Sequence, residues 1–317
     1  MNALHYVQPL YSSTGFAVGL LVGLTGVGGG SLMTPILIVL FGVHPATAVG
    51  TDLLYAAATK SAGSVVHGLN RTIDWRVVGL LAAGSVPLTI IALAVLDHID
   101  INSVAARDLI TAVLAGALVI TAMTLIFRDR IVARYAARVG AMRPRQVAIL
   151  TVAVGGVLGV LVSISSVGAG AIGVTALLLL YPKLPTARIV GSDIAHAVPL
   201  TLAAGIGHWF LGSINVDVLI SLLVGSVPGI LIGSYAAVRI PETALRVVLA
   251  GVLLVVATKL SFDTYTAAAS KRAAAAAPEI AAAAKPIVAP GAENSAPPKE
   301  ISVTAIGLRK AGSATQP

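Results

Sequence analysis

Long, predominantly apolar stretches alternate with short polar segments along this chain. They lie at about 10–43, 46–66, 75–96, 109–127, 147–181, 186–207, 215–238 and 247–258. A helix needs roughly 20 apolar residues to cross a hydrocarbon core about 30 Å thick, so the pattern predicts an all-α, polytopic membrane protein with about eight full spans. No arginine or lysine precedes the first stretch and no small-residue cleavage site follows it, which predicts a retained helix and not a secretory signal.

The composition supports this prediction and excludes an ordinary soluble enzyme. The 317 residues are 57% hydrophobic and 11% charged, whereas soluble domains carry roughly 45–50% apolar and about 25% charged residues. Cysteine is absent, which excludes disulfides and cysteine-based chemistry. The net charge of +8 alone would suit nucleic-acid binding, but the arginines cluster at 128–146, as in a cytoplasmic loop of a membrane protein. We therefore expect the lipid bilayer as a partner, and no nucleic acid.

The chain contains an internal repeat with a spacing of 140 to 141 residues. The matching segments are 26–30 with 166–170, 50–52 with 191–193, 84–87 with 225–228, and His67 with His208. This predicts two homologous membrane repeats, 10–127 and 147–260, joined by an arginine-rich cytoplasmic loop at 128–146. Residues 1–9 form the N-terminal end, and the Ala/Pro-rich residues 261–317 are predicted to be a disordered tail.

Each repeat opens with two apolar segments that are short for a membrane span and are separated by glycines. In the first repeat these segments are 10–26 and 30–43, and the second repeat is interrupted in the same way around 167–173. Irregular backbone inside a membrane occurs only where it lines protein or a cavity. Paired interruptions at matching positions therefore indicate a transporter's binding site, with close packing through small residues as the alternative.

The distribution of basic residues favours inverted repeats. If each opening pair forms a hairpin, the basic loops at 71–76, 183–188 and 239–246 lie on the same cytoplasmic side as 128–146. If each pair forms one unbroken helix, the loops at 183–188 and 239–246 lie outside. The hairpin arrangement obeys the positive-inside rule better, and it gives the two repeats opposite orientations in the membrane.

Charged residues inside the predicted spans indicate where a substrate binds. Asp52 and Lys60 lie in one span, and Asp193 lies at the matching position of the other repeat. Charges at membrane depth usually face a cavity or a partner, so Lys60 can neutralise an anion, or Asp52 and Lys60 can form a purely structural pair. The predicted substrate-binding residues supply this cation, hydroxyl groups and glycine amides: Thr25, Gly28, Gly29, Gly30, Ser31, Thr51, Lys60, Ser165, Ser166, Gly168, Gly170 and Ser192.

Asp52, Asp193 and His196 are the predicted proton-coupling residues, because ionisable groups inside transporters often form proton relays. The sequence contains no His-Glu-x-x-His, Gly-x-Ser-x-Gly or Walker motif. We therefore expect no catalytic residues, no cofactor and no metal site.

Two segments resemble a known family. Residues 23–35 (Gly-Leu-Thr-Gly-Val-Gly-Gly-Gly-Ser-Leu-Met-Thr-Pro) and 42–51 (Gly-Val-His-Pro-Ala-Thr-Ala-Val-Gly-Thr) are similar to the opening of the sulfite exporter TauE/SafE permeases, in the toluene sulfonate uptake permease group. The resemblance covers about 10–260. It implies a multi-pass permease of the bacterial inner membrane for small sulfur oxyanions or organosulfonates.

We therefore expect a secondary transporter that moves a small sulfur-containing anion, such as sulfite or an organosulfonate, by alternating access and with proton coupling. A transporter of another small anion or organic acid, and a passive anion channel, are the alternatives. The sequence leaves the direction of transport and the oligomeric state open.

Overall fold

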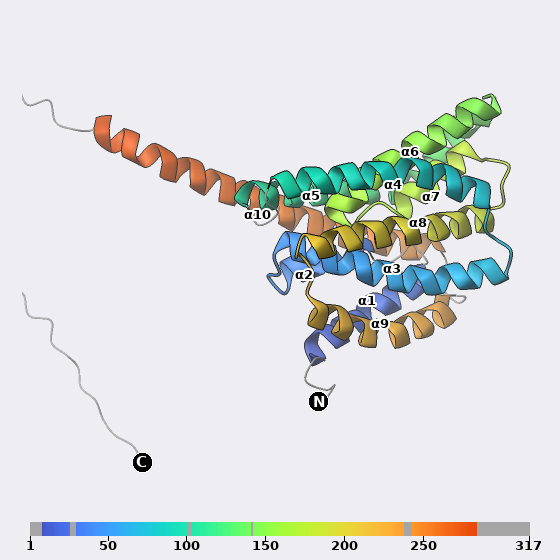
Figure 1. The fold of residues 1–317 in the computed structure, drawn as a ribbon, viewed down its shortest axis with the longest axis horizontal. Helices are drawn as coiled ribbons and strands as arrows, with labels where there is room; N and C mark the ends of the chain where they lie inside the picture. Colours follow the sequence, from blue (N-terminus) through green and yellow to red (C-terminus); the bar gives the residue numbers. More distant parts are fainter. Residues whose placement is uncertain (1–7, 26–29, 100–102, 141, 238–241, 284–317) are drawn as a thin grey trace, which may run out of the picture. The chain divides into compact units, whose positions relative to one another are not determined.

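Ten helices make up the described part of the chain (Figure 1). The computed structural model describes residues 8–25, 30–99, 103–140, 142–237 and 242–283. The helices are α1 (Pro9–Thr25), α2 (Gly30–Val39), α3 (Pro45–Leu69), α4 (Trp75–His98), α5 (Val104–Gly140), α6 (Pro144–Ser165), α7 (Ala171–Leu180), α8 (Thr186–Phe210), α9 (Val216–Ala237) and α10 (Glu242–Ala283). These residues contain no strand, which confirms the predicted all-α class.

The helix boundaries repeat with the spacing found in the sequence. Helices α3 and α8 each comprise 25 residues and begin at Pro45 and Thr186, 141 residues apart. Helices α4 and α9 begin at Trp75 and Val216, again 141 residues apart. Helices α2 and α7 both comprise 10 residues. Each helix from α1 to α5 therefore has a counterpart among α6 to α10.

The two repeats are interlocked through parallel helix pairs. The most extensive contacts join α1 with α9 and α4 with α6, so each pair combines helices of different repeats. In the second pair, Gly155 lies against the backbone of Leu81, and Gly159 lies against that of Ser85, one turn further along both helices. Glycine permits this close approach because any side chain would overlap the facing backbone. Helices α1 and α9 pack in the same way through their own glycines.

Helices α3 and α8 lie side by side and run in opposite directions (Figure 1). Gly50, near the start of α3, lies against His208, near the end of α8. At the other end of the pair, Gly191 of α8 lies against His67 of α3. The two helices that carry the predicted charged residues are therefore antiparallel neighbours.

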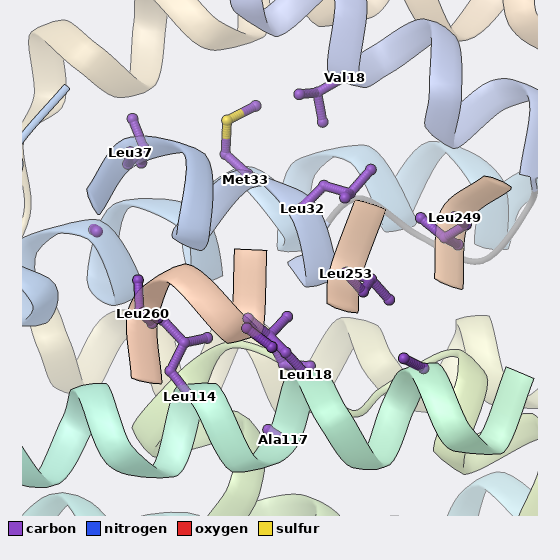
Figure 2. Packing of buried hydrophobic residues seen from close by; sticks show 14 of the residues in the cluster. Val18, Leu32, Met33, Leu37, Leu114, Ala117, Leu118, Leu249, Leu253 and Leu260 are labelled. Atoms are coloured by element: carbon purple, nitrogen blue, oxygen red, sulfur yellow. The ribbon is translucent and has the colours of Figure 1, made fainter. Parts of the chain in front are cut away.

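An apolar cluster packs α5 and α10 against the short opening helices of the first repeat. Figure 2 shows Leu114 and Leu118 of α5 facing Leu253 and Leu260 of α10. The cluster also includes Val18 of α1, several residues of α2, and residues of α3, α7 and α9. Van der Waals contacts of this kind hold helices together in lipid, where the hydrophobic effect between helices is absent.

Six described helices are long and apolar enough to cross a membrane, fewer than the eight full spans predicted. They are α4, the first 32 residues of α5, α6, α8, α9 as far as Gly233, and α10 between Thr243 and Thr266. Helices α1 and α7 are apolar but shorter. Helix α3 is 25 residues long, but its polar residues exclude it from this set.

Two segments predicted to be irregular are helical. Residues 128–140 of the predicted loop continue α5, and residues 261–283 of the predicted tail continue α10. Both segments are rich in alanine, which has the highest helix propensity, and arginine also favours helix. By its contacts the chain divides into Met1–Ala269 and Ser270–Pro317, and the structure describes the second unit only as far as Ala283.

Candidate functional site

A cavity of about 500 Å³ lies between α1, α3, α8 and α9. Most of its lining is apolar, including Ile194 of α8 and Leu223 of α9. Among the described residues, its polar side chains come from α3, namely Thr59, Lys60 and His67. At 100° per residue these three lie within roughly 100° of one another around the helix, so one face of α3 gives the cavity its polar character.

Lys60 connects the cavity to the centre of the protein. Its side chain is buried, with 7% of its surface exposed. The Nζ atom donates a hydrogen bond of 3.3 Å to the carbonyl oxygen of Ala169, in the interruption between α6 and α7. Both Asp52 and Asp193 lie within electrostatic range of this ammonium group. The cation therefore lies between the two repeats, near one carboxylate from each.

Asp52 is held by the short helix α2. Its Oδ2 atom accepts hydrogen bonds from the Thr34 hydroxyl at 2.5 Å and from the Thr34 backbone N–H at 3.2 Å. The other oxygen, Oδ1, has no hydrogen-bond partner among the described residues. One oxygen of this buried carboxylate is thus anchored, and the other is available to a ligand or a proton.

Asp193 occupies the matching position against the short helix α7. Its Oδ1 atom lies so close to Gly173, in the first turn of α7, that a Cβ atom there would overlap it. The N-terminal turn of a helix carries a partial positive charge and stabilises a carboxylate. Thr175 corresponds to Thr34 in the repeat, but its hydroxyl group has no hydrogen-bond partner in the described structure.

Two further polar pairs occupy equivalent positions in the repeats. His196 Nε2 and Ser85 Oγ are 2.9 Å apart, and both residues are fully buried. The corresponding pair is Tyr55 and Ser226, which are also buried. The Tyr55 hydroxyl is oriented toward Ser226, but neither hydroxyl has a hydrogen-bond partner within the described residues.

The interruption between α6 and α7 brings backbone groups into this region. Ser166 has a φ of 59°, and Gly168 and Gly170 each have a φ of 126°, a conformation that glycine adopts readily. Ser166 faces the carboxylate of Asp52, and its hydroxyl is unpaired in the described structure. The predicted glycine-broken opening is therefore present in the second repeat. In the first, the break at 26–29 lies outside the described residues.

The site is rich in buried polar atoms without partners. Seven side-chain atoms of the described residues in this cluster have no hydrogen-bond partner: Asp52 Oδ1, Tyr55 Oη, Ser166 Oγ, Thr175 Oγ1, Asp193 Oδ1, His196 Nδ1 and Ser226 Oγ. Native proteins leave few such atoms unsatisfied, and each requires an explanation. A concentration of them around a buried lysine indicates a polar site that binds ligands, water or protons.

Comparison with known proteins agrees with this geometry. The family model described as "Sulfite exporter TauE/SafE" matches residues 11–260. The chain belongs to the TauE/SafE family. It is 37% identical over 249 residues to the "Probable membrane transporter protein YjnA" of Bacillus subtilis (strain 168), covering 78% of this chain and 96% of the relative. It is 26% identical over 235 residues to "Probable membrane transporter protein YdhB" of the same organism, covering 73% and 91%. No solved structure matches the chain.

The family and its relatives establish a multi-pass membrane transporter, and their names indicate no enzyme. Several of the predicted site residues of this TauE/SafE transporter lie together in the structure. They are Asp52, Lys60, Ser166, Gly168, Gly170, Asp193 and His196. The structure thus brings both repeats together around Lys60.

Three predicted ligands have hydroxyl groups in structural hydrogen bonds. The Thr51 hydroxyl accepts from the backbone N–H of Asn215 at 3.1 Å, and the Ser192 hydroxyl accepts from that of Asp74 at 2.8 Å. Ser165 bonds to backbone groups of α6 and of the interruption itself. Thr51 thus connects the first repeat to the residue before α9, and Ser192 connects the second repeat to the residue before α4.

The remaining predicted ligands of the TauE/SafE transporter belong to the first interruption. Gly28 and Gly29 lie outside the described residues, as do the side chains of Thr25 and Ser31. Gly30 is the first residue of α2.

Sequence reasoning missed five residues that contribute polar groups to the cluster: Thr34, Tyr55, Ser85, Thr175 and Ser226. The repeat contained the signal for four of them. Thr34 and Thr175 are 141 residues apart, as are Ser85 and Ser226. Polar residues that recur in register within apolar segments are therefore useful markers of the site.

Proposed function

We propose that this TauE/SafE transporter is a secondary carrier that moves a small sulfur-containing anion, such as sulfite or an organosulfonate, across the bacterial inner membrane. The observation that carries the proposal is the buried Lys60 at the cavity, surrounded by unpaired hydroxyl groups. A buried cation is costly unless it is paired, so Lys60 favours a negatively charged ligand when the neighbouring carboxylates are protonated. The family name supports a sulfur oxyanion as that ligand.

Alternating access is supported by a difference between the two central helices. On α3, Thr59, Gly63 and His67 line the cavity. Their counterparts on α8 are Leu200, Ala204 and His208, which are all fully buried. This face of α3 is thus open to the cavity, whereas the equivalent face of α8 is sealed. A carrier with this asymmetry changes sides when the two repeats exchange conformations.

The sealed side has a hydrogen bond without a counterpart among the described residues of the open side. His208 Nε2 bonds to the backbone oxygen of Ser163 at 2.9 Å. Helices α1 and α6 match at a spacing of 140 residues, so the residue equivalent to Ser163 is Gly23, which lines the cavity together with His67. Opening the sealed side would break the His208 bond. The antiparallel arrangement of α3 and α8 supports the inverted repeats that such an exchange requires.

The charges around Lys60 support proton coupling. Two buried carboxylates, Asp52 and Asp193, lie within electrostatic range of this one cation. An added anion would increase the negative charge of a site removed from water, which is unfavourable. Protonation of one carboxylate would offset that charge, so anion and proton would bind together.

The basic residues after α3 support the orientation of the cavity. Arg71 and Arg76 follow the end of α3 at which His67 lies, and basic loops face the cytoplasm. The cavity is therefore assigned to the cytoplasmic side in this conformation.

Counterflow in proteoliposomes tests the proposed function. Liposomes loaded with unlabelled sulfite are diluted into a trace of labelled sulfite, and protein-free liposomes serve as the control. Transient accumulation of label above its equilibrium level is expected of a carrier. Flux without such accumulation would indicate a channel. A correctly inserted protein that gives no accumulation with sulfite, methanesulfonate or sulfate would refute the proposed substrate class.

A further inference from the structure

The Tyr55–Ser226 pair lies just beyond the residues that line the cavity. Tyr55 is one turn before Thr59 on α3. On α9, Ser226 lies three residues after Leu223 and directly before Val227. Thr59, Leu223 and Val227 all line the cavity. The pair is therefore adjacent, along both helices, to residues that line the cavity.

Both side chains are fully buried, which makes their unpaired state significant. Tyr55 and Ser226 each have 0% of their surface exposed, and neither hydroxyl has a hydrogen-bond partner in the described structure. An unpaired buried hydroxyl is unfavourable, because it has lost its hydrogen bonds to water. Tyrosine hydroxyls in protein interiors usually find a partner.

The equivalent pair in the other repeat shows what a satisfied arrangement looks like. His196 and Ser85 bond to each other at 2.9 Å, on the side where α8 is sealed. Tyr55 and Ser226 remain unpaired on the side where α3 lines the cavity. Of the two equivalent pairs, the one without a hydrogen bond therefore lies where α3 lines the cavity.

We propose that Tyr55 and Ser226 are the hydrogen-bond donors that recognise the oxygen atoms of the transported anion, while Lys60 supplies the positive charge. This inference rests on the proposed function, because it assigns additional ligands to the same site. Two O–H donors on facing helices suit an oxyanion, which presents several acceptor oxygens on one central atom. A substrate without such oxygens would leave buried donors unpaired, and sites of this kind discriminate strongly against it.

The test compares variants that remove a single hydroxyl group each. Tyr55→Phe and Ser226→Ala remove the proposed donors with little change in shape. Thr121→Val is the matched control, because Thr121 on α5 is also buried and has an unpaired hydroxyl, and no described residue of α5 lines the cavity. Full-length proteins are purified, checked for folding by size-exclusion chromatography, and reconstituted for sulfite counterflow. Binding of sulfite is measured separately in detergent by isothermal titration calorimetry.

Each donor variant is expected to raise KM and Kd for sulfite by about tenfold, the effect of losing one hydrogen bond to a charged ligand. The maximal rate should change by less than about twofold, and Thr121→Val should behave like the unchanged protein. Unchanged KM and Kd in both donor variants would overturn this inference while leaving the proposed function intact. Failure of the unchanged protein to bind or transport sulfite, methanesulfonate and sulfate would overturn both.

Discussion

The close contact between α4 and α6 leads to a prediction about stability. In the Gly84→Ala variant, the new Cβ atom would overlap the backbone oxygen of Val152 and lie 2.8 Å from the backbone nitrogen of Gly156. Because both neighbours are backbone atoms, they cannot move aside without separating the helices. Overpacking of this kind costs about 1–3 kcal/mol, and a contact between two backbones belongs at the upper end of that range.

A matched control lies on the same helix. At Gly79, a Cβ atom would meet nothing within 4 Å. Both substitutions gain about 1 kcal/mol from the higher helix propensity of alanine. Gly79→Ala should therefore stabilise the protein slightly, whereas Gly84→Ala should destabilise it by about 2 kcal/mol, so that the two variants differ by about 3 kcal/mol.

Thermal unfolding in detergent measures this difference. One kcal/mol corresponds to roughly 2–4 °C in a domain of 150–250 residues, so the two unfolding midpoints should differ by roughly 6–12 °C. Circular dichroism follows the loss of helix directly, since the described chain is helical. Equal midpoints, or a higher midpoint for Gly84→Ala, would show that the α4–α6 contact does not depend on the absence of a side chain.

Three further predictions concern transport. Lys60→Met should abolish sulfite counterflow with little loss of folded protein. The control Lys259→Met, at an exposed site on α10, should preserve counterflow. Equal counterflow rates in the two variants would show that Lys60 is not part of the site. Asp52→Asn should remove the dependence of sulfite uptake on an imposed pH gradient, and retained dependence would transfer the proton-coupling role to Asp193. The chain has no cysteine, so single introduced cysteines can report which side of the protein is accessible. Gly63→Cys should react with a thiol reagent added from the cytoplasmic side, and Ala204→Cys should not. Equal labelling of the two variants would contradict the proposed asymmetry.

The sequence predicted the repeat, but not the contacts that each polar side chain makes. The spacing of 141 residues anticipated the matching bounds of α3 and α8. It also identified Asp52 and Asp193, since acidic residues in apolar segments are conspicuous. It could not show how the repeats interlock, and this determines what each hydroxyl contacts. Thr51 and Ser192 therefore appeared to be ligands, although each one bonds to the backbone of the opposite repeat.

Local helix propensity accounts for the helical ends of α5 and α10. The segment 128–146 was interpreted as a loop because of its charge, but charge determines the side of the membrane and not the backbone conformation. Alanine and arginine continue α5 through Gly140. The same reasoning applies to 261–283, where an alanine-rich sequence extends α10. Low complexity alone was a poor guide to structure there.

The pairing of α1 with α9 has a consequence for how the protein is made. Helix α1 begins at Pro9, but its partner α9 begins only at Val216. At a synthesis rate of about 5–20 residues per second, α1 leaves the ribosome roughly 10–40 s before its partner does. During that interval its glycine face contacts lipid or the insertion machinery. This helix pair therefore cannot form until the chain has been made as far as α9, which ends at Ala237. A truncation before α9 should leave an inserted but unassembled first repeat.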